Sequence, residues 1–159
     1  MKNIFILSGF AIVLLASCGK NLPDVGATAA QEIANEWWVT LDSVGKADYF
    51  GIGHIKIATY NTSANDDSIW VDDLGHGWNV KFKAKADFSN LTFGTNNSSN
   101  LYYPITVNLN DGKVFLDAGH TRSGNVADSI HMKLEFSDDP GVIYEMNGVA
   151  RTRFAEDDY

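Results

Sequence analysis

The chain has 159 residues, with 12 Lys and Arg against 20 Asp and Glu, and a formal net charge of −8 at pH 7. A chain this acidic repels phosphate backbones and anionic membrane surfaces, which argues against nucleic-acid binding. It carries one cysteine, so no disulfide can form within it, and the fold must depend on a hydrophobic core.

The N-terminus has the pattern of an export signal that ends at a cysteine. Lys2 precedes an apolar run over residues 4–16, which is shorter than the roughly 20 residues that span a bilayer. Leu15-Ala16-Ser17 then stands directly before Cys18, as in the lipobox of a bacterial lipoprotein. We expect residues 1–17 to be removed and Cys18 to carry the acyl chains that anchor the protein to a membrane. The alternative is an ordinary signal peptide that happens to end near a cysteine.

The next segment, residues 18–34, is predicted to be the lipidated N-terminus and a linker that ends in a short helix over residues 27–34. Thr28 can act as its N-cap with Gln31 three residues later, which is a capping-box pattern. Gly19-Lys20 lacks the aspartate that often retains lipoproteins at the inner membrane, so we expect an outer-membrane location on either face.

From residue 35 onward the hydrophobic pattern has a period of two, which predicts a single β domain over residues 35–159. Residues 78–86 and 130–136 alternate strictly between apolar and polar, as half-buried strands do. Less regular strands are expected over residues 37–41, 52–60, 68–72, 91–93 and 142–154. About eight or nine short antiparallel strands predict a sandwich or a closed barrel.

A hairpin is predicted near the middle of the chain. The alternating residues 101–109 are followed by Asn110-Asp111-Gly112, and Asp-Gly between two such runs is a strong hairpin signal. We therefore expect residues 113–118 to pair back on the preceding strand. The asparagines and serines of residues 96–100 predict a turn before it.

Several short motifs together resemble a known family. They are the lipobox, Glu36-Trp37-Trp38-Val39-Thr40, Ala58-Thr59-Tyr60-Asn61-Thr62, Ser68-Ile69-Trp70-Val71-Asp72-Asp73 and Leu91-Thr92-Phe93. In order and spacing they resemble bacterial lipoproteins described as lipid-binding putative hydrolases, which adopt calycin-like barrels. The resemblance implies an all-β, antiparallel up-and-down, lipocalin-like β-barrel of about eight strands with a short N-terminal helix.

The same resemblance implies how one barrel end is closed. Calycins carry a Gly-x-Trp pattern on the first strand, and Asn35-Glu36-Trp37 takes its place here. In lipocalins a late arginine packs across that tryptophan, and Arg151 and Arg153 are the candidates. The alternative is that both arginines are simply solvated near the C-terminus.

Inward-facing side chains on the strands are the candidates for ligand binding. An eight-stranded barrel encloses an interior that is filled by side chains or holds one small ligand. The predicted lining of a cavity for a lipid or another small apolar ligand consists of Trp70, Trp78, Phe82, Tyr103, Met132, Phe136 and Tyr144. The alternative is that these side chains only fill the core.

Catalytic and metal-binding patterns are weak. The nearest approach to a catalytic cluster is the turn that holds Asp117, His120, Arg122 and Ser123, where side chains usually point into solvent. The four histidines lack a short metal-ligand spacing, and the acidic doublets at residues 66–67 and 72–73 lack that of a calcium loop. We therefore expect no catalytic residue, metal site or cofactor.

The sequence as a whole favours a lipid-anchored β-barrel that binds a lipid or another small apolar ligand. A partner-binding subunit of an outer-membrane assembly is the alternative. A lipid-ester hydrolase, which rests on the family description and the loop around His120, is a more distant one. Expected partners are the membrane, through acyl chains on Cys18, and a small apolar ligand, but not nucleic acid.

Overall fold

The computed structural model describes residues 26–47 and 49–159. The predicted signal peptide, Cys18 and the first part of the linker lie outside these described residues. No helix that could cross a membrane occurs in the part of the chain that the structure describes.

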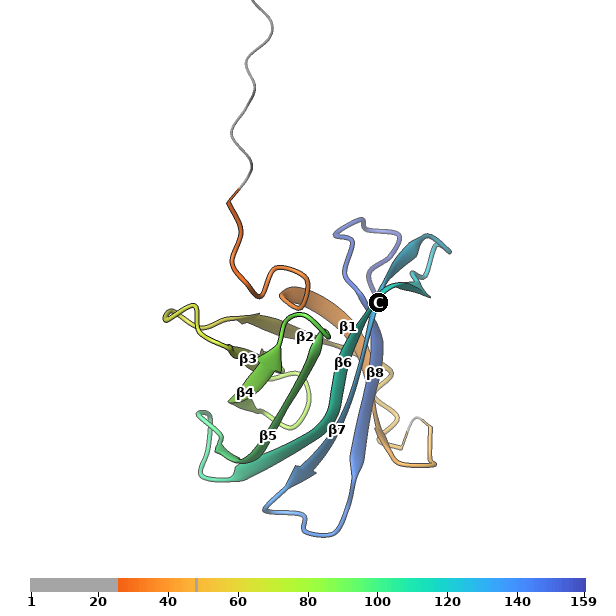
Figure 1. Ribbon diagram of the computed structural model, residues 1–159. Helices are drawn as coiled ribbons and strands as arrows, with labels where there is room; N and C mark the ends of the chain where they lie inside the picture. The colour runs from red at the N-terminus through yellow and green to blue at the C-terminus, as the bar shows by residue number, and fades with distance from the viewer. Residues whose placement is uncertain (1–25, 48) are drawn as a thin grey trace, which may run out of the picture.

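Eight antiparallel strands follow one another around a closed barrel (Figure 1). They are β1 (Asn35–Ser43), β2 (His54–Asn61), β3 (Ser68–Asp72), β4 (Lys81–Asp87), β5 (Thr92–Ser99), β6 (Thr106–His120), β7 (Val126–Phe136) and β8 (Tyr144–Ala150). Each strand pairs with the next in sequence, and β8 pairs with β1 to close the sheet. The predicted all-β, up-and-down barrel of eight strands is confirmed.

Strict alternation of apolar and polar residues places the core inside the barrel. Phe82, Ala84 and Ala86 of β4 are buried, and the lysines between them face outward. Every second residue of β7 from Ile130 to Phe136 is buried in the same way. This is the arrangement that the period of two predicts for strands with one face in the core.

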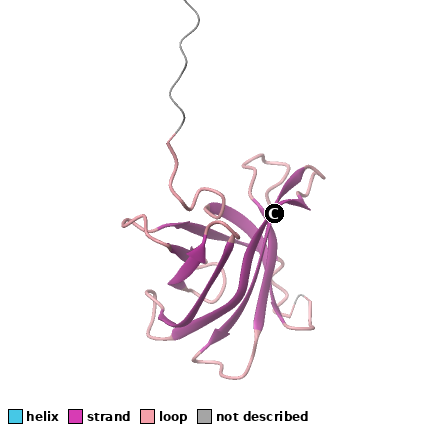
Figure 2. Cartoon of the chain, in the orientation of Figure 1, coloured by secondary structure: helices cyan, strands magenta, loops and turns pink. Residues whose placement is uncertain are grey.

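The predicted helix over residues 27–34 forms turns instead, and Figure 2 shows only strands and loops in the described residues. The amide of Ala34 donates to the carbonyl of Ala30 at 2.7 Å, which closes a single helical turn. Ala30 and Ile33 are buried beneath the barrel, and β1 begins at Asn35. The segment is therefore too short to propagate a helix beyond its first turn.

The predicted hairpin at Asp111-Gly112 is wrong, because β6 runs straight through it as one strand of 15 residues. Asn110 pairs with Lys133 and Lys113 with His131, so β6 has one extra residue here relative to β7. Asp111 adopts a positive φ of 54°. The Asp-Gly pair therefore makes a β-bulge, in which one residue needs the left-handed conformation that a tight turn would also need.

The turn predicted over residues 96–100 is also largely strand. Residues 96–99 belong to β5, which shifts its register against β6 between Thr95 and Ser98. Asn97 has a positive φ of 52°, and its amide donates to Oδ1 of Asn108 at 2.7 Å. A turn-forming residue is again used for a bulge inside a long strand.

The two ends of the barrel are built differently. Antiparallel pairing places the connections after β1, β3, β5 and β7 at one end, which we call the mouth: residues 44–53, 73–80, 100–105 and 137–143. The turns of residues 26–34 and the C-terminal residues 151–159 lie at the opposite, closed end (Figure 1). The described chain thus enters the barrel at the end away from the mouth.

Candidate functional site

The interior of the barrel is filled by its own side chains. Phe82, Met132 and Phe136 are at most 1 % exposed and belong to one continuous hydrophobic core. Three pockets of about 600, 440 and 370 Å³ lie along the described residues, and none is lined by any of the seven predicted cavity residues. The ligand-binding role of those seven side chains stays a prediction, and their packing matches the alternative of a filled core.

Four of the seven predicted residues come together at the mouth. Trp78 stacks on Phe136 with ring centroids 4.8 Å apart, and Tyr144 lies 4.9 Å from Trp78. The hydroxyl of Tyr103 and the indole N–H of Trp78 both donate to Asp138. Burial, followed by the bond to Asp138, raises the pKa of Tyr103 to about 12, so its hydroxyl remains a donor at neutral pH.

The rings of Trp78, Phe136, Tyr144 and Phe50 form a cluster at the mouth, which we call the aromatic plug. Phe50 was not among the predicted site residues. Its ring lies 5.8 Å from that of Tyr144 and 6.0 Å from that of Trp78. The only sequence signal was an aromatic pair, Tyr49-Phe50, inside an otherwise glycine-rich connection. The plug closes the mouth with aromatic contacts of the kind that stabilise protein cores.

Asp73 directly follows β3, at the start of the mouth connection of residues 73–80, and continues the buried series of Ile69 and Val71. Its side chain is buried, and its Oδ1 accepts the amides of Gly75 and Val80 at 2.9 Å each. Burial raises its pKa, against the effect of nearby loop amides. The carboxyl group thus organises the connection between β3 and β4.

Trp70 does not face the interior as predicted. Ile69 and Val71 take the inward positions of β3, so Trp70 between them points outward. The Nζ atoms of Lys83 and Lys81 lie 5.1 and 5.6 Å from the centre of its ring. The prediction failed because aromatic character was given more weight than the strand's own alternation.

Trp37 lies in the core at the closed end, as the resemblance implied. Its side chain is 0 % exposed, and its Nε1 donates to Oγ1 of Thr59 at 2.8 Å. The Thr59 hydroxyl in turn donates to the carbonyl of Ile33, whose side chain is also fully buried. The indole therefore ties β1, β2 and the N-terminal turn together.

The late arginines do not pack across Trp37. Arg151 lies on the outer face, with its Cζ 6.0 Å from the ring centre of the neighbouring Trp38. It forms ion pairs with Glu36 at 2.9 Å and Asp158 at 2.7 Å. Arg153 is mostly exposed and lies 3.9 Å from Glu36. Because Ala150 takes the inward position opposite Trp37, Arg151 must point outward.

Acid should loosen this closed end. Hydrogen bonds from Arg151 lower the pKa of Asp158 to about 2, and those from Ser123 and Thr152 hold the pKa of Asp157 well below its usual range. Unfolded aspartates titrate near pH 3.9, so this contribution to stability is complete above about pH 5 and disappears as the pH falls through about 2.

Urea unfolding midpoints measured between about pH 6 and pH 2 should therefore decline steeply at the acid end. The Asp158→Asn variant should start lower at neutral pH and lose less on acidification. Parallel pH profiles for the two proteins would show that the pairs of Asp158 contribute nothing.

The loop with the predicted catalytic candidates anchors the C-terminus instead. Oγ of Ser123 donates to Asp157 at 2.5 Å, and Nη1 of Arg122 donates to the carbonyl of Asp158 at 3.1 Å. Within residues 49–159 no hydrogen bond joins His120 to Ser123, so these two side chains are not arranged as a nucleophile and its histidine base. Nor do three or more potential ligands gather for a metal ion anywhere in the described chain.

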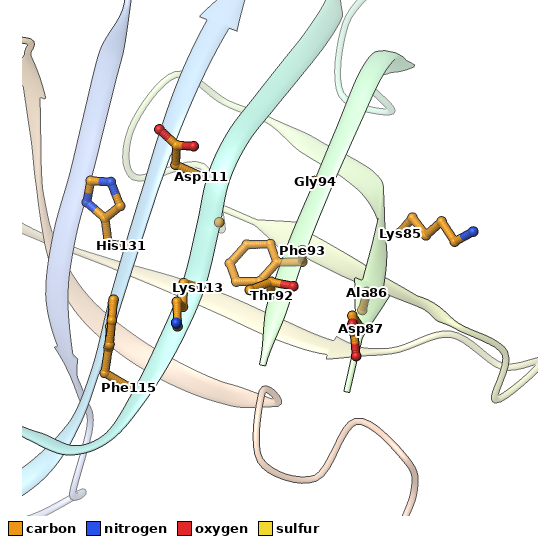
Figure 3. A pocket seen from close by; sticks show the side chains of 11 residues that line it. Lys85, Ala86, Asp87, Thr92, Phe93, Gly94, Asp111, Lys113, Phe115 and His131 are labelled. Carbon is orange, nitrogen blue, oxygen red and sulfur yellow. The ribbon is translucent and has the colours of Figure 1, made fainter. Parts of the chain in front are cut away.

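An open groove of about 600 Å³ lies on the outer surface of the barrel (Figure 3). It runs across β4, β5, β6 and β7. Its lining consists of Lys85, Ala86, Asp87, Thr92, Phe93, Gly94, Asp111, Gly112, Lys113, Phe115 and His131. None of these residues was predicted as a site residue, so the sequence analysis missed the groove altogether.

Glycine and the bulge of β6 make this groove possible. Gly94 pairs with the outward Lys85 and contributes no side chain to the outer surface. Gly112 approaches β5 so closely that a Cβ atom would lie 2.3 Å from the carbonyl oxygen of Phe93. Glycine inside a strand often marks a close approach of backbone or ligand, which was the one available sequence signal.

The lining combines apolar surface with charge. Phe115 is 41 % exposed and forms one wall, whereas Phe93 and Ala86 border the groove from beneath, since their side chains are buried in the core. Lys85 and Lys113 bring positive charge to the rim. An apolar surface with a few polar groups is the usual make-up of a small-molecule site.

A family model described as lipid-binding putative hydrolase matches residues 22–155. The match covers every strand of the barrel together with the groove. No curated protein matches the chain significantly.

Proposed function

The chain belongs to the family of lipid-binding putative hydrolases, and from this membership we propose that its barrel binds one lipid-like molecule in the outer groove over β4–β7. The observation that carries the proposal is the groove itself. Its volume of about 600 Å³ falls within the range of roughly 300–1,000 Å³ typical of small-ligand sites. The interior, in contrast, is occupied by the protein's own core.

The anchor forms the second part of the proposal. Acyl chains on Cys18 would hold the protein at the outer membrane, as the lipobox suggests. The eight Cα–Cα steps from Cys18 to Gly26 can span at most about 29 Å, so the barrel would remain close to the membrane. Replacing Cys18 with alanine should release the protein into the soluble fraction and remove the acyl mass from its N-terminal peptide.

Filling the groove tests the binding site. Gly94→Leu should lower the affinity for an apolar fluorescent probe such as Nile red by about tenfold or more, because the new side chain occupies the groove. Gly94→Ala is the matched control, since both variants share the contact of a Cβ atom 3.1 Å from the carbonyl of Leu109. Equal affinities in all three proteins would place the ligand elsewhere and contradict the proposal.

A partner-binding role is the second candidate, because one observation favours it. Large apolar side chains are exposed in all four connections of the mouth: Val44, Tyr49, Phe50, Ile52, Leu74, Leu101, Tyr102 and Ile143. Clustered exposed apolar residues often mark interaction surfaces. Crosslinking in whole cells through a photoreactive residue at position 101 would test it, and recovery of the monomer alone would contradict it.

A further inference from the structure

We infer that the groove selects a lipid with an anionic head group, which Lys113 and Lys85 bind at the rim while the chain lies over Gly94 and along the ring of Phe115. This inference rests on the proposed function. It adds the chemical class of the ligand, which neither the family description nor the barrel fold provides.

The lining of the groove carries two lysines, Lys85 and Lys113, and two aspartates, Asp87 and Asp111, in a strongly acidic protein. Formal charge over the whole chain is −8, yet the outward positions of β4 are three lysines in succession, Lys81, Lys83 and Lys85, followed by one aspartate, Asp87. Lys81 is held by Asp72 at 3.2 Å, and Lys83 lies over the ring of Trp70. Lys85 is the member of this row that lines the groove.

The two lysines of the groove remain available for a ligand. Lys85 lies 3.7 Å from Asp67, but both side chains are mostly exposed, and such pairs contribute little. Lys113 lies on β6 with its Nζ 5.1 Å from the ring centre of Phe115. No carboxylate forms an ion pair with Lys113 among the described residues. A cation next to an exposed apolar ring suits an amphiphile.

The acids of the groove are already engaged by other groups. Asp111 forms an ion pair with Lys133 at 2.9 Å. Asp87 accepts hydrogen bonds from Ser89 and Asn90 in the adjoining turn. Lys133 thus offsets the charge of Asp111, and the carboxylate of Asp87 is occupied by donors of its own turn. Lys85 and Lys113 remain as the groups that can bind an incoming anionic head group.

The groove beside Gly94 is suited to an alkyl chain. Figure 3 shows Phe93 and Thr92 on β5, with Gly94 beyond them and Lys113 and Phe115 on the neighbouring β6. Since Gly94 has no side chain, the outer surface is open at the level where Lys85 pairs with it. Apolar contact contributes about 0.8 kcal/mol per CH₂ buried, so even a partly covered chain adds substantial affinity.

Isothermal titration calorimetry with single-chain amphiphiles tests the head-group selection. We would titrate the full barrel with dodecanoate, dodecyl phosphate, dodecylamine and dodecanol, each below micelle formation and at low salt. The two anions should bind about tenfold more tightly than the alcohol or the amine, and added salt should reduce this difference.

Charge variants show whether the lysines are responsible. Lys113→Glu and Lys85→Glu should each lower the affinity for dodecanoate by about three- to tenfold and leave that for dodecanol unchanged. Lys83→Glu is the matched control, because Lys83 also faces outward on β4 but does not line the groove. Its affinities should equal those of the original protein.

Failure of the inference differs from failure of the proposed function. If dodecanol binds as tightly as dodecanoate and Gly94→Leu lowers the affinity for both, the groove binds lipids without selecting their head group. If dodecanoate binds but is insensitive both to Gly94→Leu and to the lysine variants, the ligand lies elsewhere and both statements are wrong. Absence of binding by all four amphiphiles would also overturn both.

Discussion

Replacing Trp37 with alanine should lower the free energy of unfolding by about 3–5 kcal/mol, the usual range for truncating a fully buried large aromatic side chain. The indole is 0 % exposed and packs at the closed end, where residues 26–34 cover the barrel. The variant would also remove the donor to Thr59 at 2.8 Å. Chemical unfolding followed by circular dichroism measures the loss.

The neighbouring tryptophan provides a matched control. Trp38 lies on the outer face of the same strand, where it contacts Tyr159 and donates to Asp158 at 3.1 Å. Trp38→Ala should therefore cost much less than Trp37→Ala. The Trp37→Phe variant keeps most of the ring but loses the hydrogen bond, which should cost about 1–3 kcal/mol. Equal losses for the two alanine variants would contradict a specific role for Trp37 in closing the barrel.

The all-β fold was predictable because many short segments with a hydrophobic period of two can form only a few architectures, such as a sandwich or a barrel. In β4 and in residues 130–136 of β7 each apolar residue lies inside and each polar residue outside, so sequence alone identified the core face. The up-and-down order of the strands, in which each pairs with the next, was implied by the family resemblance and agrees with the tendency of short connections to join neighbours. Closure into a barrel rather than a sandwich depended on the resemblance, and the pairing of β8 with β1 confirms it.

The local errors in the predicted turns arose at residue types that occur both in hairpin turns and in β-bulges. Asp111-Gly112 and Asn97 are residues that tolerate a positive φ, which both hairpin turns and β-bulges require. Periodicity cannot distinguish the two, because each interrupts the alternation for one or two residues. Only the pairing partners on β5 and β7 show that β6 continues without a turn.

The candidate site was much harder to predict than the fold. The groove brings together Lys85 of β4, Gly94 of β5 and Lys113 of β6, and their proximity depends on register. That register is changed by the very bulge that was mistaken for a hairpin. The aromatic residues, in contrast, were recognised individually, but sequence could not show that the rings of Trp78, Phe136 and Tyr144 contact one another at the mouth.

The second large effect on stability is expected where β8 pairs with β1, a junction that we call the seam of the barrel. Gly148 pairs with Val39 in the ladder that closes the barrel. A Cβ atom on Gly148 would lie 2.1 Å from the carbonyl oxygen of Trp38 and 2.6 Å from Cγ1 of Val39. Real side chains do not approach a backbone oxygen so closely, so β1 or β8 would have to shift.

Gly148→Ala should therefore destabilise the protein by about 3 kcal/mol or more, because overpacking in a well-packed core already costs about 1–3 kcal/mol without a clash against backbone. The urea midpoint measures this loss, and limited proteolysis near residues 147–149 detects a seam that opens locally. Gly94→Ala is the control, since its Cβ would lie 3.1 Å from the nearest backbone oxygen, and Gly26→Ala has nothing within 4 Å. If all three alanine variants unfold at the same urea concentration, β8 does not close on β1 at this register. A loss confined to Gly148→Ala would mean that the barrel closes through direct backbone contact at this glycine.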